Sequence, residues 1–289
     1  METPPTSQPS SPEKKSSDLP ELVTFRNVSK QFGTGPKAKI ALKEVSFIVH
    51  DLPNVGELVS MVGPSGCGKS TVLRLIAGLA PHHAPTTGEV IVFGRPVTGP
   101  NVERGLVDQK YSLLPHLTVL ENIAFGLKLR GVSRKERLGQ ACEWVKKVSL
   151  EGAEDKYPSE LSGGMQQRVA IAATLILKPK ILLMDEPFGA LDPRTRLRMQ
   201  ELLIDLWKEQ QGTVFFVTHS VEEALYLGDR VFRMAANPGR LVEVLSVPRP
   251  DEPPEVLRRK PWFAELREEL VRRLEEDAAA GGKWAAQPS

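Results

Sequence analysis

The chain has 289 residues, of which 40% are hydrophobic and 26% charged, and its formal net charge is +2. These proportions exclude a wholly disordered or fibrous chain, and the near balance of charge gives no support to nucleic-acid binding, which favours a basic face. Since there is no apolar run of the roughly 18 residues that span a bilayer and no apolar leader at the start, we expect a cytoplasmic protein.

Residues 1–20 are rich in Pro, Ser and Thr. Such a composition buries too little apolar surface to offset the entropy lost on ordering, so we expect a disordered tail. Partial alternation then predicts antiparallel strands from Leu22 to Val28 and from Ala41 to Val49. The apolar stretches GELVSMVG, GEVIVFG and RGLVDQ are predicted as strands, and STVLRLIAGL as a helix that ends at Gly78.

The pattern becomes helical between Leu117 and Arg168. VLENIAFGLKLR and RKERLGQACEWVKKV both carry apolar residues at helical spacing, and we expect an inserted helical subdomain at about 115–168. Strand patterns return at KILLMDEP, GTVFFVTH and DRVFRMAANPGRLVEV, with the helix PRTRLRMQELLIDLWKEQQ after the first of them. Apolar strands that alternate with helices predict an α/β protein with a parallel sheet covered on both faces.

The last part of the chain, 247–289, is predicted to be a linker followed by an amphipathic helix. PRPDEPP has the composition of a linker, and in WFAELREELVRRLEED four apolar side chains share one helical face: Phe263, Leu266, Leu270 and Leu274. This face either packs on its own domain, which is the preferred interpretation, or binds a partner.

The stretch GPSGCGKST matches the phosphate-binding pattern G-x-x-x-x-G-K-[ST] and lies between a predicted buried strand and a predicted helix. Its glycines let backbone N–H groups point at phosphate oxygens, Lys69 can reach the β- and γ-phosphates, and the Ser70 hydroxyl can ligate Mg²⁺. We interpret Cys67 as a small side chain that fits the loop rather than as a redox group. The predicted nucleotide-binding residues of this loop are Gly63, Pro64, Ser65, Gly66, Cys67, Gly68, Lys69, Ser70 and Thr71.

The stretch ILLMDEP supplies two carboxylates at the carboxyl end of a predicted central strand, where α/β sheets bind ligands. Asp185 is predicted to hold Mg²⁺ through its water shell, and Glu186 to orient and deprotonate the attacking water. Gln109 and His219 also follow apolar strands, and Gln109 can offer its amide oxygen to the metal or the water. Taken alone, each of these two is more often a structural residue.

A second phosphate-binding layout occurs in LSGGMQQR. Its turn Ser162-Gly163-Gly164 immediately precedes an apolar run at helical spacing. Free backbone N–H groups and the positive end of the helix dipole make such a helix start an anion site.

The motifs GPSGCGKST, LSGGMQQR, ILLMDEP, GALD and VTHS, in this order, resemble the ATP-binding subunits of ATP-binding-cassette (ABC) transporters over about Leu22 to Leu245. The resemblance implies an ABC ATPase domain at 21–246, built from a P-loop NTPase core, an N-terminal antiparallel β subdomain and the inserted α-helical subdomain. It implies that Gln109 is the coupling glutamine, His219 the γ-phosphate sensor and Phe32 the adenine-stacking aromatic, and that residues 190–192 contact a second subunit. The signature loop it implies consists of Ser162, Gly163, Gly164 and Gln166.

The stretches GRPVTGPNVERGLV, LLPHLTVLENIAFGL, DEPFGALD and ANPGRLVEV look like the importer subfamily that serves nitrate, aliphatic sulfonates and taurine. This similarity implies an ATPase that uses ATP and Mg²⁺ and closes as a homodimer, because one copy of each motif gives two composite sites under twofold symmetry. It further implies separate permease subunits, a solute-binding protein and a peripheral position at the cytoplasmic face of the inner or plasma membrane.

Two alternatives stay open, and three positions depart from the family pattern. The chain could be an ABC ATPase that acts on nucleic acid or the ribosome, or a nucleotide-binding regulatory subunit with little hydrolysis. Asp108 replaces the usual Phe before the glutamine, Ala173 the usual Arg of the signature helix, and Ser220 the Asp after the histidine. Asp108 places a charge at the strand end that faces the metal.

Overall fold

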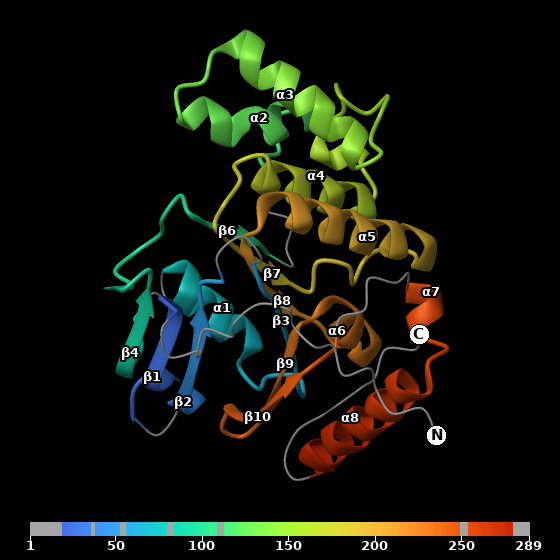
Figure 1. The fold of residues 1–289 in the computed structure, drawn as a ribbon. Helices are drawn as coiled ribbons and strands as arrows, with labels where there is room; N and C mark the ends of the chain where they lie inside the picture. Colours follow the sequence, from blue (N-terminus) through green and yellow to red (C-terminus); the bar gives the residue numbers. More distant parts are fainter. Residues whose placement is uncertain are drawn as a thin grey trace.

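The computed structural model describes residues 19–35, 38–52, 56–79, 84–108, 113–248 and 254–279. Most of the predicted tail, the predicted coupling residue Gln109, most of the PRPDEPP linker and residues 280–289 lie outside the described residues. The described chain folds into two sheets surrounded by helices (Figure 1).

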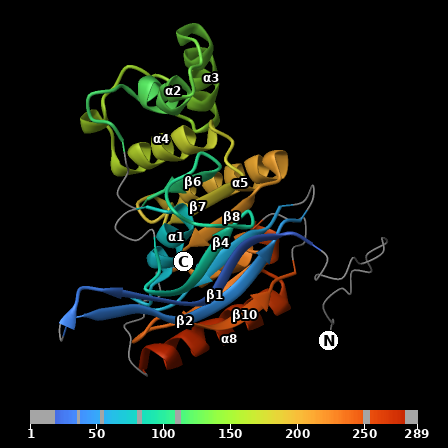
Figure 2. The same ribbon diagram turned by 90° about the vertical axis from the view of Figure 1, so that its left-hand side faces the viewer.

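The first sheet has four antiparallel strands in the order β2-β1-β4-β5. The strands β1 (Glu21–Phe32) and β2 (Lys39–His50) form a long hairpin that projects from the rest of the molecule (Figure 2). The other two are β4 (Thr87–Val92) and the short β5 (Arg95–Pro96). The predicted antiparallel β subdomain is confirmed.

The second sheet has six strands in the order β10-β9-β3-β8-β7-β6. Five of them are parallel: β3 (Leu58–Val62), β6 (Arg104–Val107), β7 (Ile181–Asp185), β8 (Thr213–Val217) and β9 (Arg230–Ala235). The stretch DRVFRMAANPGRLVEV forms two strands, and β10 (Arg240–Ser246) pairs antiparallel with β9 at the edge. The connection between them is too short for the crossover that a parallel pair needs.

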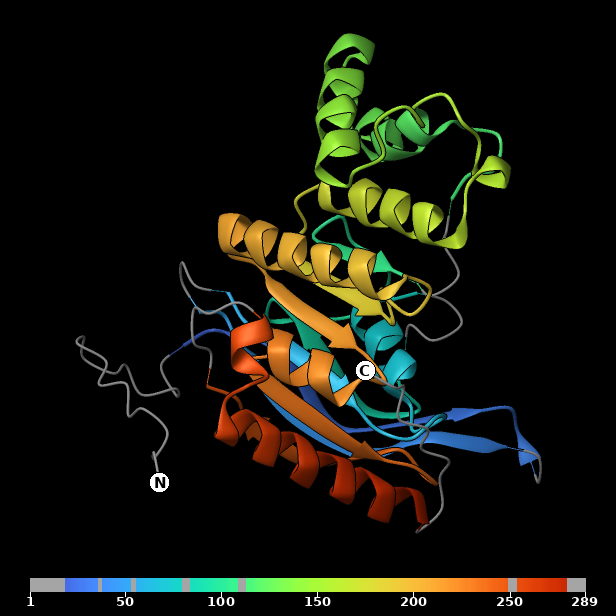
Figure 3. The same cartoon turned by 90° about the vertical axis from the view of Figure 1, so that its right-hand side faces the viewer.

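Side chains of the central strands alternate between two hydrophobic cores, because successive residues of a strand point to opposite faces. On β7, Ile181 and Leu183 pack with the first sheet and α1 (Lys69–Ala77), and Leu182 and Met184 pack with the helices on the other face. These helices include α4 (Gly163–Leu175) and α5 (Pro193–Gln210), which lie side by side along the sheet (Figures 1 and 3).

The helical region above α4 contains α2 (Val119–Leu129), α3 (Arg134–Lys147) and the 3₁₀ turn η3 (Pro158–Glu160). Thr118 and Glu121 form a capping box that begins α2, and the Ser133 hydroxyl caps α3. The helix α4 packs against both parts of the molecule: its side chains share one hydrophobic core with α2 and α3 and with the sheet strand β7.

The C-terminal helices α7 (Pro254–Leu257) and α8 (Pro261–Ala279) pack beside α6 (Val221–Leu227) and the β9–β10 edge (Figure 3). Phe263, Leu270 and Leu274 are buried in a third apolar cluster, with Leu266 partly buried against it. The amphipathic face therefore packs on its own domain, which is the preferred one of the two predicted alternatives. In the described ranges, there is no helix with the length and apolarity that a membrane span requires.

Candidate nucleotide site

The glycine-rich loop connects the buried strand β3 to the first residue of α1. Gly68 is the N-cap of α1 and has a left-handed φ of 95°. A Cβ at this position would lie 2.5 Å from Leu42 Cδ2 and 2.9 Å from the Ala41 carbonyl oxygen. Only glycine fits this close approach to β2. The loop thus delivers the free N–H groups of the start of α1, which are suited to an anion.

The Lys69 side chain is buried and folds back into the loop. Its Nζ donates hydrogen bonds to the carbonyl oxygens of Gly63 at 2.7 Å and Pro64 at 3.2 Å. The Cys67 sulfur lies 3.7 Å from the same ammonium, and burial raises the pKa of its thiol. A protonated, fully buried thiol fits the interpretation of Cys67 as a packing residue.

Ser70 and Asp185 bring two oxygen ligands together at the carboxyl edge of the sheet. The Ser70 hydroxyl donates to Asp185 Oδ1 at 3.0 Å, and Asp185 is 4% exposed at the end of β7. Burial is the main cause that raises the pKa of Asp185, and the hydrogen bond from Ser70 opposes it. A buried carboxylate beside a hydroxyl fits Mg²⁺, which prefers oxygen ligands and would compensate the charge.

Asp108, one of the departures from the family pattern, lies close enough to Asp185 for its charge to act on that carboxyl. Its Oδ2 is 3.5 Å from Nη2 of Arg74 on α1. The Asp108 charge raises the pKa of Asp185 and the Arg74 charge lowers it, so this ion pair contributes to the electrostatic field at Asp185. Arg74 was not predicted from the sequence, where it reads as an ordinary polar residue of an amphipathic helix.

Glu186 and His219 lie at the ends of the neighbouring strands β7 and β8 and face each other. His219 Nε2 is 2.7 Å from Glu186 Oε1, and each side chain is about one-fifth exposed. The hydrogen bond from His219 is the main cause that lowers the pKa of Glu186. Glu186 therefore carries an ionised carboxylate at neutral pH, which a general base requires.

The backbone of Glu186 is held in a left-handed conformation, with φ of 51°. Its N–H donates to the Val217 carbonyl at 3.0 Å, and its carbonyl accepts from Gln167 Nε2 at 3.4 Å. A non-glycine residue in this region is strained and persists where the surroundings fix it, often at functional sites. Gln167 was missed by the sequence reasoning, which assigned the neighbouring Gln166.

A hollow of about 300 Å³ joins these segments. The predicted residues that line it are Phe32, Ser65, Gly66, Gly68, Lys69, Ser70, Thr71, Glu186 and His219. Lys39 and Ala41 also line it and were not predicted, although Lys39 is the register partner of Phe32 in the β1–β2 hairpin. Gly63, Pro64 and Cys67 belong to the loop without lining the hollow, and Asp185 lies behind Ser70.

The signature residues lie elsewhere on the described chain and do not line this hollow. Ser162 is the N-cap of α4, and its hydroxyl accepts from the Met165 N–H at 3.3 Å. A Cβ on Gly164 would lie 3.0 Å from Leu191 Cδ2, so this turn abuts the predicted dimer loop. Gln166 donates its side-chain amide to the carbonyls of Pro158 at 2.9 Å and Leu161 at 3.3 Å. The structure thus shows a helix start capped by Ser162, away from the glycine-rich loop, and its binding of phosphate stays a prediction.

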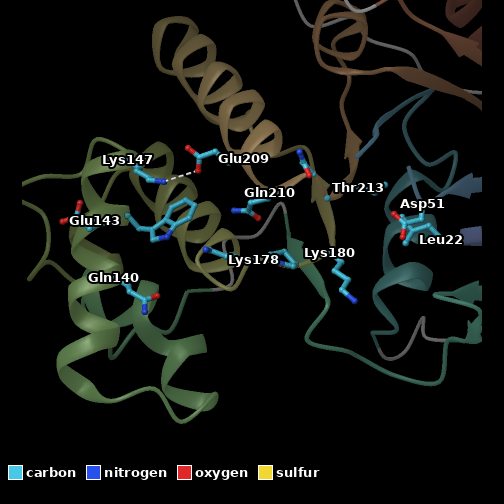
Figure 4. Close-up of a pocket in the computed structure, with 14 residues that line it drawn as sticks. Leu22, Asp51, Gln140, Glu143, Lys147, Lys178, Lys180, Glu209, Gln210 and Thr213 are labelled. Atoms are coloured by element: carbon cyan, nitrogen blue, oxygen red, sulfur yellow. Dashed lines mark ion pairs between the residues drawn. The ribbon is translucent and has the colours of Figure 1, made fainter. Parts of the chain in front are cut away.

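A larger hollow, of about 850 Å³, lies at the amino-terminal ends of the strands, opposite the carboxyl ends that carry the candidate site (Figure 4). It is bordered by α3, the C-terminal end of α5 and the starts of β7 and β8, and Lys147 Nζ pairs with Glu209 across it at 3.7 Å. Its walls carry both lysines and carboxylates and include none of the predicted site residues. Chemistry and position, rather than size, identify the smaller hollow as the candidate nucleotide site.

Comparisons with known proteins agree with this assignment. The family described as ABC transporter matches residues 42–189. An uncharacterized ABC transporter ATP-binding protein of Methanocaldococcus jannaschii is 47% identical over 81% of this chain and 85% of its own length. The nitrate import ATP-binding protein of Synechocystis is 46% identical over 80% and 86%. The taurine import ATP-binding protein of Rhizobium johnstonii is 48% identical over 80% and 87%.

The fold also matches solved structures. A dimeric ATP-binding cassette in a post-hydrolysis state, bound to ADP and Pi, aligns with a TM-score of 0.71 and 34% identity. The alignment covers 78% of this chain and 99% of that cassette. The chain belongs to the ABC transporter family.

Proposed function

We propose that the chain is the ATP-hydrolysing subunit of an ABC importer for a small solute of the nitrate, sulfonate or taurine kind. The observation that carries the proposal is the Glu186–His219 pair at 2.7 Å, in the same hollow as the glycine-rich loop. A phosphate cradle alone supports binding. An ionised carboxylate placed beside it supports hydrolysis.

In this proposal the loop residues hold the triphosphate. Backbone N–H groups of residues 63–71 bind phosphate oxygens, and Lys69 exchanges the carbonyls of Gly63 and Pro64 for the β- and γ-phosphates. Phe32 stacks on the adenine from the wall of the hollow formed by β1. Ser70, Asp185 and Gln109 would hold Mg²⁺, which when bound would neutralise charge that develops on the phosphate oxygens.

Hydrolysis depends on Glu186 and His219. Glu186 accepts the proton of the attacking water, and its low pKa keeps it ionised beforehand. His219 holds Glu186 by their hydrogen bond and reaches the γ-phosphate from the end of β8. The strained backbone of Glu186 fixes the direction from which the carboxylate enters the site.

We also propose that two copies form a head-to-tail homodimer. The turn at Ser162, Gly163 and Gly164 and the loop at 190–192 adjoin each other and lie outside the hollow of their own chain. In a twofold dimer they complete the partner's site, since an isologous pairing creates two identical composite sites. The solved cassettes similar to this chain are dimeric.

The proposed domain organisation follows from these roles. Residues 21–246 form the ATPase domain, with the helical subdomain at about 115–168 as the docking region for separate permease subunits, and 247–289 form the C-terminal extension. The permease subunits place the chain peripherally at the cytoplasmic face of the inner or plasma membrane. A separate solute-binding protein delivers the cargo. Relatives named as nitrate, taurine and aliphatic-sulfonate import proteins support this assignment.

The experiment is a pull-down from detergent extract followed by ATPase assays of the reconstituted complex. We expect to recover a very hydrophobic permease protein, and we expect its binding protein plus nitrate, a sulfonate or taurine to stimulate hydrolysis. Glu186→Gln in the same complex supplies the background rate. Recovery of nucleic acid without a permease would support the nucleic-acid alternative. A wild-type rate equal to that background, with the permease present, would support the regulatory alternative.

A further inference from the structure

A carboxylate that is largely shielded from solvent lies outside the nucleotide hollow, between α6 and α5. The Glu223 side chain is 11% exposed. Its Oε2 accepts from the Thr218 hydroxyl at 2.5 Å, and its Oε1 accepts from Gln200 Nε2 at 3.0 Å. Burial raises the pKa of Glu223, with these hydrogen bonds opposing the effect. Keeping a carboxylate largely out of water costs free energy, so this arrangement points to a role beyond the packing of two helices.

One side of the arrangement is the turn that carries His219. The Thr218 hydroxyl donates to Glu223 and also accepts from the Ser220 N–H at 3.0 Å. The Ser220 hydroxyl in turn accepts from the Glu223 N–H at 3.2 Å and caps α6. Serine is as good a helix cap as the usual Asp, which accounts for this departure from the family pattern. Glu223 thus ties down the residues on both sides of His219.

The other side is α5, which begins directly after the predicted dimer loop. Gln200, which is buried, donates to Glu223 from the middle of this helix. Arg196 Nε lies 3.7 Å from Glu223 Oε1, and its Nη2 donates to the Leu191 carbonyl at 3.3 Å. The carboxylate is therefore fixed to an element that is anchored to residues 190–192.

We propose that Glu223 is a positioning residue for hydrolysis: it fixes the Thr218–Ser220 turn against α5, so that His219 stays within hydrogen-bond distance of Glu186. The inference rests on the proposed ATPase function. Glu186 and His219 come from different strands, and nothing covalent sets their separation of 2.7 Å. Small displacements of catalytic groups reduce rates strongly, so a rigid support for the turn increases the turnover rate.

The decisive comparison is between two substitutions of Thr218 in the full-length chain. Thr218→Ser keeps the hydroxyl and loses a methyl group, whereas Thr218→Val keeps the volume and loses the hydroxyl. We expect Thr218→Ser to retain kcat for ATP within about twofold and Thr218→Val to lose about tenfold or more, since the support of His219 is lost. The KM for ATP should change little in both, because neither touches the glycine-rich loop.

A second comparison uses two adjacent carboxylates of α6. Glu223→Gln keeps the shape but cannot accept from both Thr218 and Gln200 without turning a donor toward one of them. Glu222 is 13% exposed, nearly the same as Glu223, but it pairs with Arg258 of the C-terminal segment. We expect Glu223→Gln to lower kcat about tenfold and Glu222→Gln to change it less than about twofold.

The outcomes separate this inference from the proposed function. If wild type hydrolyses ATP above the Glu186→Gln background but Thr218→Val and Glu223→Gln retain the wild-type kcat, the positioning role is wrong and the ATPase assignment stands. A loss of kcat in Thr218→Ser with retention in Thr218→Val would show that volume, not the hydroxyl, matters, and would also overturn it. If wild type equals the Glu186→Gln background, the proposed function fails and the inference fails with it.

Discussion

His219 Nε2 lies 2.7 Å from Glu186 Oε1, although the two residues end different strands and are separated by a complete helix and strand. Their meeting follows from the parallel pairing of β7 and β8, in which Asp185 is the register partner of Val217. Glu186 follows Asp185 directly and His219 follows Val217 by two residues, so both lie at the carboxyl ends of the two strands. The hydrogen bond keeps Glu186 ionised, and this pair is the centre of the proposed hydrolysis.

Glu186→Gln removes the proposed base while preserving the size of the side chain and an oxygen that can accept a hydrogen bond. We expect nucleotide affinity to be retained and hydrolysis to fall by about 100-fold or more, the usual contribution of a general base. The slowed protein should accumulate as an ATP-bound dimer, visible by gel filtration in the presence of Mg-ATP. Unchanged turnover would show that another group accepts the proton.

Lys69→Ala and Ser162→Ala should damage the protein in different ways. Lys69 is buried in the loop of its own site, so its loss should abolish tight ATP binding measured by fluorescence titration on the monomer. Ser162 caps α4 outside that hollow. Its loss should leave monomeric binding almost unchanged and reduce dimer formation and hydrolysis. Equal loss of binding in both variants would argue against a composite site.

Much of the site was predictable because its residues are adjacent in the sequence. The loop from Gly63 to Thr71 and the pair Asp185 and Glu186 each combine a recognisable local pattern with a strand end. Residues that join the site through tertiary contacts carry no such pattern. Lys39 lines the hollow because it pairs with Phe32 across the β1–β2 hairpin, and Gln167 belongs to the site because it contacts the Glu186 carbonyl. Glu223 reads as an ordinary helix residue until α5 is placed against it.

In the fold, too, elements with a local sequence pattern were predictable and features set by tertiary contacts were not. Buried strands such as β3 and β7 are predictable from continuous apolar runs, and α1 from its spacing and its Gly78 end, where the C-cap has the left-handed φ of 74°. The antiparallel edge at β10 was not distinguished from β9, because both belong to one stretch with strand character. The direction of an edge strand depends on the length of its connection rather than on its own pattern.

Glu269 on α8 should titrate far below an ordinary glutamate. Hydrogen bonds from Arg272, and then Arg273, lower its pKa from 4.5 to about 2. Since the folded pKa is the lower one, the stabilisation by this carboxylate is present above pH 4.5 and is lost as the pH falls toward 2. Carbon NMR of selectively labelled protein should show the low pKa, and Arg272→Gln with Arg273→Gln should raise it toward 4.5.

A control for this titration is Arg267→Gln on the same helix, which removes one positive charge two positions before Glu269, where helical residues do not face each other. It should leave the pKa of Glu269 nearly unchanged. High salt should raise the pKa of Glu269 in the wild type, because salt screens exposed ion pairs and the Debye length falls to about 3 Å at an ionic strength of 1 M. A pKa near 4.5 in the wild type would show that the two arginines do not hold this carboxylate in solution.

Leu274→Ala tests whether α8 is part of the folded domain. Leu274 is fully buried with Val62 of β3 and Val221 of α6 in the same cluster. Truncation of a buried leucine costs about 2–5 kcal/mol, and we expect the free energy of unfolding measured with urea to fall by that amount.

The control is Arg267→Ala, on the same helix but outside the cluster, which should change the free energy of unfolding by less than about 0.5 kcal/mol. Since none of the residues of this cluster lines the nucleotide hollow, folded Leu274→Ala should keep its ATP affinity. Wild-type stability in Leu274→Ala would mean that α8 separates from the domain in solution and is free for a partner.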